Sequence, residues 1–382
     1  MKTFMPIRSF LVASLVLALA GPAMAQERAK PAMEYPTANV LTAWLDQANI
    51  HPSVTVGSLT FFPLSAEEAD KVDRVWTMPE ALSEGKLAIE ELEPADLNRL
   101  RFVNHSDRLV LCLAGQVIEG GKQNRTLATD ALLPLEESVV LPIYCVQKGR
   151  WTDEKGRFSQ PSVGMAPMAV RNSAAAGAGQ QQVWEDVNRS NEQMKVATPD
   201  KDLLAGLKDK RTQGWLERAR RIVIDKLPGN CVGVVVSRGQ EFVGADLFNR
   251  PELFRPMRDG LLDSYLLAIY PEQIEPLAKD GDRAAEGTIP VRPIRRPTQQ
   301  ECKAYLGRCY QAELAPMDSP GAGQQHRLRG GIDGTVLSYK DKMVHTHLAP
   351  RVYATHEPPP VPQPVPVPPP VPLPRPEPPH VQ

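Results

Sequence analysis

The chain has 382 residues and a formal net charge of −1, and its positive and negative side chains are interspersed. This near-neutral, mixed pattern carries no electrostatic footprint for nucleic acid, so we expect no nucleic-acid partner. Apart from the two terminal segments described below, the chain is long enough for one large domain or two ordinary ones.

The N-terminus has the features of a secretory signal peptide in the right order. Lys2 and Arg8 precede an apolar run from Phe10 to Ala20, and Ala23-Met24-Ala25 forms a small-x-small cleavage site. The apolar run is shorter than the ~20 residues that span a bilayer core. We therefore predict a signal peptide at residues 1–25 and an exported mature protein, periplasmic or extracellular, without a membrane span.

Helix and strand patterns follow each other irregularly through the first half of the body. Apolar residues recur at helical spacing from Thr37 to Ala48, with the first residue as the N-cap. Val54 to Leu64 is rich in β-branched and aromatic residues and predicts a strand that stops at Pro63. A short helix is expected over Pro79–Gly85. Further strands are expected at Val72–Trp76, Leu87–Leu92, Leu100–Val103, Leu109–Ala114, Arg125–Ala131 and Ser138–Val146.

The second half begins with a loop-like stretch, Pro161–Gly179. A later segment at residues 275–298 is charged and contains prolines, which predicts an internal linker or a long surface loop. Helices are expected over Gln182–Met194, Leu203–Leu227, Glu252–Tyr270 and Cys302–Tyr310, and hairpins over Cys231–Gly244 and Thr335–Leu348. Strands interrupted by helix pairs, without regular β-α alternation, predict an α+β domain at residues 35–350 with mixed, mainly antiparallel sheets.

Residues 357–382 have a different composition, dominated by proline with valine as the main filler. Proline fixes φ and removes the backbone donor, so this tail is expected to be disordered and to populate polyproline II. It is either a plain spacer or a ligand for an envelope protein with an aromatic groove.

Five cysteines are an odd set for an oxidising compartment, so at least one must be free or paired between chains. Cys112, Cys145 and Cys231 lie in apolar, strand-like runs and are expected to be buried. Cys302 and Cys309 would lie about 10 Å apart along a helix, beyond disulfide reach. None has C-x-x-C spacing, which leaves zinc and redox functions weakly supported.

The most informative motif is Lys122-Gln123-Asn124-Arg125, which follows Gly120-Gly121 between two apolar runs. Four consecutive long polar side chains after a glycine pair can present amide and guanidinium donors to an anion or a polar ligand. The alternative is a structural turn whose side chains bond the backbone and carboxylates such as Glu136 or Glu137.

Several ordered segments together resemble a bacterial family named for its association with ADP-ribosylglycohydrolases and rhodanese-phosphatases. The resemblance extends from Val56 to Pro350 and rests on Gly57–Leu64, Gly120–Arg125, Cys145–Trp151, Gln182–Trp184, Gly244–Phe248 and Met343–His345. It implies a link to the metabolism of ADP-ribose and other NAD-derived nucleotides, by association and not by chemistry.

Other polar residues near these segments are weaker candidates. Arg150 and Trp151 could form a second wall of the ligand site, with the indole stacking on a base or sugar ring, although packing over a sheet edge is the alternative. Asn249 follows an apolar hairpin and could bind ligand or cap the next helix. Glu119 and Asp246 are weak catalytic candidates.

His345 and His347 share one face of a strand at i, i+2, a spacing that can chelate a metal, but no third ligand is identifiable and we expect no metal site. The chain contains no G-x-S-x-G, H-E-x-x-H, P-loop or G-x-G-x-x-G motif, and no cofactor is indicated.

The leading hypothesis is an exported protein that binds a polar, anionic small compound, such as a nucleotide, an ADP-ribose-like molecule or a sugar phosphate, at Lys122–Arg125. A hydrolase-type enzyme acting on a nucleotide or sugar derivative is one alternative. A cell-envelope interaction protein that works through its proline-rich tail is the other.

Overall fold

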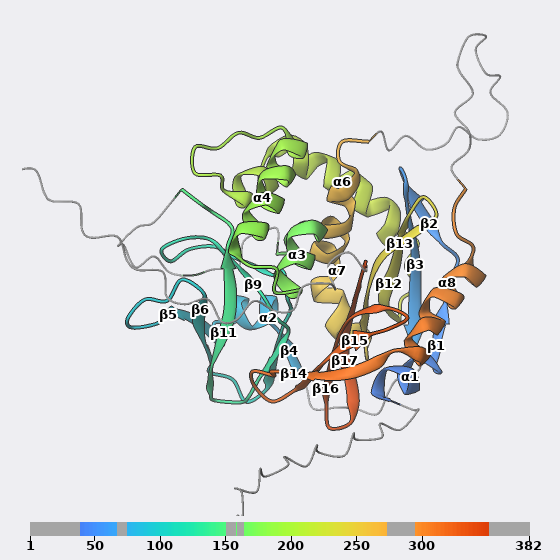
Figure 1. The fold of residues 1–382 in the computed structure, drawn as a ribbon, viewed down its shortest axis with the longest axis horizontal. Helices are drawn as coiled ribbons and strands as arrows, with labels where there is room; N and C mark the ends of the chain where they lie inside the picture. The colour runs from blue at the N-terminus through green and yellow to red at the C-terminus, as the bar shows by residue number, and fades with distance from the viewer. Residues whose placement is uncertain (1–38, 67–74, 150–157, 159–163, 273–294, 351–382) are drawn as a thin grey trace, which may run out of the picture. The chain divides into compact units, whose positions relative to one another are not determined.

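The computed structural model describes residues 39–66, 75–149, 158, 164–272 and 295–350. The expected signal peptide, most of the expected linker and the proline-rich tail lie outside the described residues, as do Arg150 and Trp151. Helices and mainly antiparallel sheets are mixed along the described chain, which confirms the α+β class (Figure 1). In this part of the protein no helix has both the length and the apolar character that a bilayer crossing requires.

The largest sheet has nine strands, all antiparallel to their neighbours, in the order β1-β3-β12-β13-β17-β16-β15-β14, with β2 paired to β3. Its strands are β1 (Ala48–Ile50), β2 (Val54–Val56), β3 (Leu59–Ala66), β12 (Cys231–Arg238), β13 (Glu241–Phe248), β14 (Glu313–Met317), β15 (Gln324–Arg329), β16 (Asp333–Tyr339) and β17 (Lys342–Ala349).

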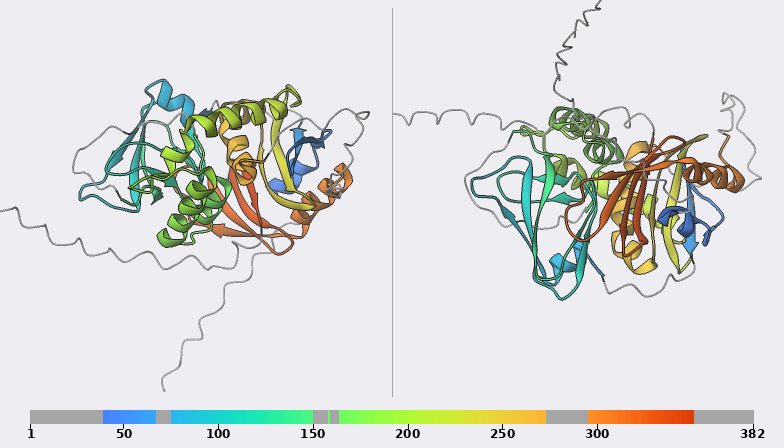
Figure 2. Two further views of the ribbon diagram at one scale, coloured as in Figure 1. Left: turned by 90° about the horizontal axis from the view of Figure 1, so that it is seen from above. Right: turned by 60° about the horizontal axis from the view of Figure 1, so that its bottom comes forward.

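Two smaller sheets are formed by residues 75–149, and they lie to one side of the nine-stranded sheet (Figure 2). One has the order β10-β7-β4, with β4 and β7 parallel, and the other has the order β5-β6-β11-β9-β8. Their facing side chains share one hydrophobic core. The strands are β4 (Val75–Thr77), β5 (Leu87–Glu91), β6 (Arg99–Asn104), β7 (Leu109–Cys112), β8 (Val117–Ile118), β9 (Arg125–Leu127), β10 (Ala131–Leu133) and β11 (Ser138–Cys145).

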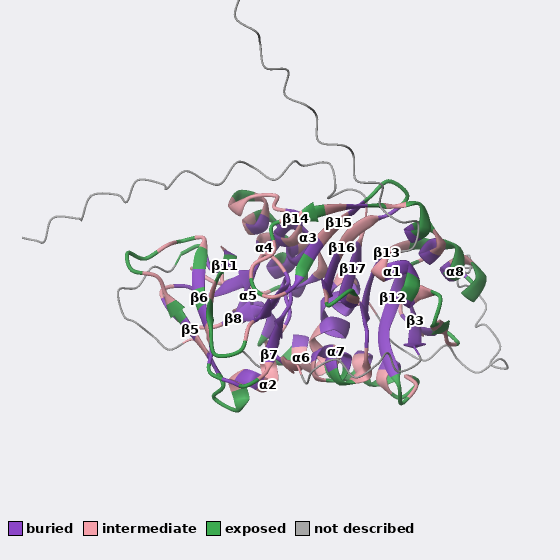
Figure 3. Ribbon diagram, turned by 90° about the horizontal axis from the view of Figure 1, so that it is seen from below, coloured by how far each residue is buried: buried purple, intermediate pink, exposed green. Residues whose placement is uncertain are grey.

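The nine-stranded sheet is covered on both faces. In β3, Leu59 and Phe61 belong to the core that includes the long helix α7, whereas Phe62 and Leu64 belong to the core that includes α1 and α8. This alternation places successive side chains on opposite faces, and both faces are buried, as the colouring of the central strands shows (Figure 3). The α-helices are α1 (Val40–Leu45), α2 (Met78–Ser83), α3 (Met168–Ala175), α4 (Gln180–Met194), α5 (Leu203–Leu207), α6 (Lys210–Ile224), α7 (Pro251–Leu266) and α8 (Gln299–Gly307), with 3-10 turns η1 (Leu267–Ile269) and η2 (Arg308–Gln311).

The start of the body differs from the prediction in two places. Helix α1 is shorter than expected and is capped by Asn39, whose side chain accepts hydrogen bonds from the backbone of Leu41 and Thr42. At its other end, Ala48 belongs to strand β1 and not to the helix. The predicted strand over Val54–Leu64 is a hairpin, because the chain turns between β2 and β3 at Gly57, where φ is +54°.

Strand β3 continues through Pro63, where we expected it to stop. On one edge of β3, β2 pairs with Leu59–Phe61 and β1 pairs with Leu64–Ala66, so Pro63 lies between the two partners. A missing amide donor is tolerated there because neither strand needs it.

Two helical predictions were also wrong. The helix expected over Leu203–Leu227 is divided into α5 and α6, because the Asp209 side chain accepts hydrogen bonds from Arg211 and Thr212 and starts a new helix. The stretch Pro161–Gly179, expected to be a loop, contains α3.

The other helices and strands agree more closely with the predictions. The helices α4, α7 and α8 and both hairpins are confirmed within a few residues, although β13 runs on to Phe248. The region up to β11 is rich in strands as predicted, but the strand expected over Arg125–Ala131 was wrong: β9 ends at Leu127, and Ala131 begins β10 in another sheet. The three cysteines expected to be buried are buried, and all five are free thiols.

Candidate functional site

The segment Lys122–Arg125 lies between β8 and β9, and Gln123, Asn124 and Arg125 are all buried. Asn124 Nδ2 donates to the carboxylate of Asp202 at 3.0 Å, and Asn124 Oδ1 accepts from the amide of Gly120 at 3.1 Å. Asn124 therefore holds the turn together, and its carboxylate partner is neither Glu136 nor Glu137.

Arg125 is different, because its side chain is fully buried and its three guanidinium nitrogens make no hydrogen bond with any described residue. Among the described residues, the nearest carboxylate oxygen is Glu91 Oε1, which lies 4.0 Å from Nη2 and accepts the backbone N–H of Lys122 at 3.0 Å. The other Glu91 oxygen and Gln123 Oε1 are also buried without a hydrogen-bond partner. The segment thus contains an unsatisfied buried cation beside unsatisfied acceptors.

A second cluster of buried charged groups lies where α3 meets β13 and β17. We call it the ionic network, and its members are Asp130, Arg171, Asn172, Asp246, Tyr265, His345 and His347, all of them buried. Arg171 donates from Nη1 to Asp246 Oδ2 at 2.8 Å and from Nη2 to Asp246 Oδ1, which makes a bidentate pair. Gly115 permits this approach, since a Cβ there would lie 2.3 Å from the Arg171 side chain.

Asp246 uses both carboxylate oxygens within the ionic network. Besides Arg171, Oδ2 accepts from the Tyr265 hydroxyl at 2.7 Å and Oδ1 accepts from His345 Nε2 at 3.2 Å. Burial alone would raise the pKa of Asp246, but the Arg171 guanidinium overrides burial and holds that pKa well below its usual value. Asp246 is therefore an anion at neutral pH, and both of its carboxylate oxygens are already engaged within the network.

His345 lies between two carboxylates. Its Nδ1 is 2.6 Å from Asp130 Oδ2, on the opposite side from Asp246. Burial would lower the pKa of His345, but Asp130 and Asp246 raise it to about 9. Burial would raise the pKa of Asp130, but His345 outweighs burial and that pKa is lowered. His345 is a cation at neutral pH and donates to both carboxylates.

His347 is the neutral member of the network. Burial and the adjacent Arg171 both lower its pKa. Its Nε2 lies 2.9 Å from Asn172 Oδ1 and its Nδ1 lies 3.0 Å from Arg171 Nη2. Because Asn172 Oδ1 can only accept and the guanidinium can only donate, the proton is on Nε2.

The formal charges of the ionic network cancel, since Arg171 and His345 balance Asp130 and Asp246. The described residues include no group of three or more His, Cys, Asp or Glu side chains that could hold a metal ion. The two histidines do share a strand with Asp246 opposite, but the Arg171 guanidinium contacts both Asp246 and His347. A cation already stands where the metal would have to bind.

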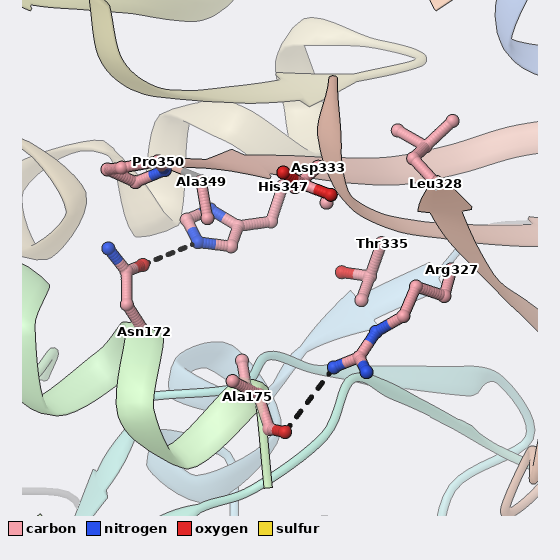
Figure 4. Close-up of a pocket in the computed structure, with 11 residues that line it drawn as sticks. Asn172, Ala175, Arg327, Leu328, Asp333, Thr335, His347, Ala349 and Pro350 are labelled. Carbon is pink, nitrogen blue, oxygen red and sulfur yellow. Dashed lines mark hydrogen bonds between the residues drawn. The ribbon is translucent and has the colours of Figure 1, made fainter. Parts of the chain in front are cut away.

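A small pocket of about 40 Å³ opens beside this network (Figure 4). Asn172 and His347 line one side, and Arg327 and Thr335 come from strands β15 and β16 on the other. Arg327 donates weakly to the Ala176 carbonyl at 3.4 Å, and burial with the nearby Arg329 lowers its pKa. The pocket is large enough for water or a small ion and far smaller than the 300 Å³ or more typical of organic ligands.

The remaining candidates are dispersed. Glu119 forms a partly exposed ion pair with Lys208 at 2.7 Å. Asn249 is buried but does not cap α7, whose N-cap is Arg250. Arg150 and Trp151 are outside the described part of the chain, so their role stays a prediction.

Sequence reasoning missed four members of the ionic network: Asp130, Arg171, Asn172 and Tyr265. The sequence did contain a signal for the ionic network, because Asp246 and the two histidines interrupt otherwise apolar strands. Such residues need buried partners.

The family can now be compared with this geometry. Residues 47–349 match the ARG and Rhodanese-Phosphatase-superfamily-associated Protein domain, ARPP-1. The chain belongs to this family. The ARPP-1 match includes Arg125 and every member of the ionic network. No curated protein and no solved structure matched the chain.

Proposed function

We propose that this ARPP-1 protein is exported and binds a small polar anion, of the nucleotide, ADP-ribose-like or sugar-phosphate class, at Lys122–Arg125. The observation that carries the proposal is the fully buried Arg125 guanidinium, which makes no hydrogen bond with the described residues. Moving such an ion out of water costs several kcal/mol unless its donors are satisfied. An anionic ligand oxygen would satisfy them through charge-assisted hydrogen bonds.

The Arg125 guanidinium itself favours an anion over a neutral ligand. Among the described residues, the one carboxylate near it, Glu91, lies 4.0 Å from Nη2 without a hydrogen bond. The carboxylate of Asp202 accepts a hydrogen bond from Asn124 instead. The unsatisfied Gln123 and Glu91 oxygens could accept hydrogen bonds from ligand hydroxyls. A phosphorylated or nucleotide-like sugar offers both kinds of group.

The family description supports the choice of ligand class. ARPP-1 is named for association with ARG and rhodanese-phosphatase superfamily proteins. ADP-ribose, nucleotides and sugar phosphates are therefore the first compounds to test.

Export is the second part of the proposal and rests on Lys2, Arg8 and the small-x-small site that ends at Ala25. Mass spectrometry of protein isolated from its native host should find a mature N-terminus at or near Gln26. Full-length protein that begins at Met1 and remains in the cytoplasm would contradict this part.

Isothermal titration of the mature chain with the three ligand classes tests the binding part. Replacing Arg125 by Gln removes the guanidinium and should weaken binding about 10- to 100-fold, the usual worth of a hydrogen bond to a charged group. The matched control is Arg101→Gln on β6. Arg101 is half exposed, and its ion pair with the exposed Glu90, at 3.9 Å, is too long for a hydrogen bond. Equal affinity in Arg125→Gln and Arg101→Gln would refute the site.

A further inference from the structure

A second pocket, which we call the arginine pocket, lies between the tip of the β12–β13 hairpin and helix α8. It has a volume of about 250 Å³ and is lined by residues that include Phe242, Arg295, Arg296, Glu301, Tyr305 and Arg308. None of these residues belongs to the Lys122–Arg125 segment or to the ionic network. The arginine pocket is therefore separate from the site proposed above.

The arginine pocket carries an excess of positive charge. Arg295 pairs with Glu301 at 2.7 Å. Arg296 donates to the backbone carbonyl of Gly57 at 3.1 Å, and Arg308 lies over the Tyr305 ring at 5.8 Å. Neither Arg296 nor Arg308 has a carboxylate within ion-pair distance among the described residues. Three arginines and one glutamate leave a net charge of +2.

An aromatic floor gives the arginine pocket a fixed shape. The rings of Phe242 and Tyr305 stack with centroids 4.5 Å apart and an angle of 13° between their planes. Tyr305 is buried, whereas Phe242 keeps part of its surface exposed. Thr298 and Glu301 form a capping box at the start of α8, which fixes the helix that carries Glu301, Tyr305 and, just beyond its end, Arg308.

We propose that the arginine pocket binds a small organic phosphate. The phosphate group accepts hydrogen bonds from Arg296 and Arg308, whose planar guanidinium forks match phosphate oxygens. A phosphate monoester carries a charge of about −1.5 to −2 at pH 7, which matches the net charge of the pocket. The organic part rests on the exposed surface of Phe242, and the volume suits a mononucleotide or a sugar phosphate better than inorganic phosphate alone.

Calorimetric titration of the full mature chain with AMP, ribose 5-phosphate, inorganic phosphate and adenosine tests this proposal. We expect Arg308→Gln to weaken binding of AMP and ribose 5-phosphate by about 10- to 100-fold. The control Arg221→Gln, on the exposed face of α6, should leave both affinities unchanged. Adenosine, which lacks the phosphate, should not bind.

A second variant separates the organic part from the phosphate. Phe242→Leu should weaken binding of AMP and leave the weak binding of inorganic phosphate unchanged. The variant Arg125→Gln keeps the arginine pocket intact. AMP binding to this pocket must therefore still be detected by calorimetry in that variant, even if the function proposed above fails. AMP binding that is unchanged in Arg308→Gln, or adenosine that binds as tightly as AMP, would overturn the proposal.

Discussion

Two arginines of this protein are equally buried and have opposite surroundings. Arg171 is 1% exposed and bonds Asp246 through two guanidinium nitrogens, with His347 as a third contact. Arg125 is 0% exposed, and its guanidinium makes no hydrogen bond with the described residues and only a 4.0 Å approach to Glu91. Burial alone therefore does not distinguish a charge that is paired within the fold from one that has no hydrogen-bond partner.

The difference is the basis on which we assign a structural role to Arg171 and propose a binding role for Arg125. Arg171 and its partners come from α3, β13 and β17, and His345 extends the network to Asp130 beside β10, so the ionic network ties residues 75–149 to the nine-stranded sheet. The charges of the network balance and its ionised groups are paired with one another, although Arg171 Nε and Asn172 Nδ2 have no hydrogen-bond partner among the described residues. Such a network resists removal of any charged member. Arg125 has no hydrogen-bonded partner to lose among the described residues, which is why we propose that its unsatisfied donors serve a ligand.

The largest effect should come from breaking the ionic network. Replacing Asp246 by Asn keeps the shape but leaves the Arg171 and His345 cations without their shared anion, which should cost roughly 3–5 kcal/mol of unfolding free energy. Urea denaturation measures this cost. Asp259→Asn, which changes a half-exposed aspartate on α7, is the control and should change stability by less than about 1 kcal/mol. A small loss in Asp246→Asn would show that the network is not structural.

The pH dependence of stability should show the same network. The folded pKa of His345 is raised to about 9 from an unfolded value of 6.5, so its stabilising contribution is complete below pH 6.5 and is lost as pH rises through 9. The carboxylates Asp130 and Asp246 have lowered pKa values, so their contribution is lost at acidic pH.

Unfolding measured from pH 6 to 10 should thus show declining stability, and His345→Gln should flatten that decline. Asp263, whose pKa burial raises to about 7 despite the opposing Arg220, titrates at the lower edge of this range in both proteins. Comparing the two proteins therefore isolates His345. An identical slope in the variant would contradict the assignment of His345 as a buried cation.

The smallest effect should come from an exposed pair. Glu119 and Lys208 are bonded at 2.7 Å, but both side chains are more than a third exposed. Solvent screening and side-chain entropy leave such pairs worth about 0 to 1 kcal/mol, so Glu119→Gln should shift the unfolding free energy by no more than that. A larger loss would mean that the ion pair is coupled to the neighbouring polar segment.

The sequence predicted the α+β class and the main strands, because apolar periodicity is a local signal. The binding role of Lys122–Arg125 stays a prediction. The sequence could not predict the ionic network, whose members come from positions as far apart as Asp130 and His347. Helix α3 was missed because Met168–Ala175 mixes polar and apolar residues without a clear apolar face and follows Pro167. What makes it a helix is the tertiary pairing of Arg171 and Asn172 with partners on β13 and β17.

The central claim is that the buried Arg125 serves a ligand and the buried Arg171 serves the fold. The most direct test compares the unfolding free energies of Arg125→Met and Arg171→Met in buffer without ligand. Arg171→Met strands Asp246 and should cost roughly 3–5 kcal/mol, whereas Arg125→Met removes an unsatisfied cation and should be neutral or stabilising. A loss of stability in Arg125→Met as large as that in Arg171→Met would contradict the account and make Arg125 a second structural arginine.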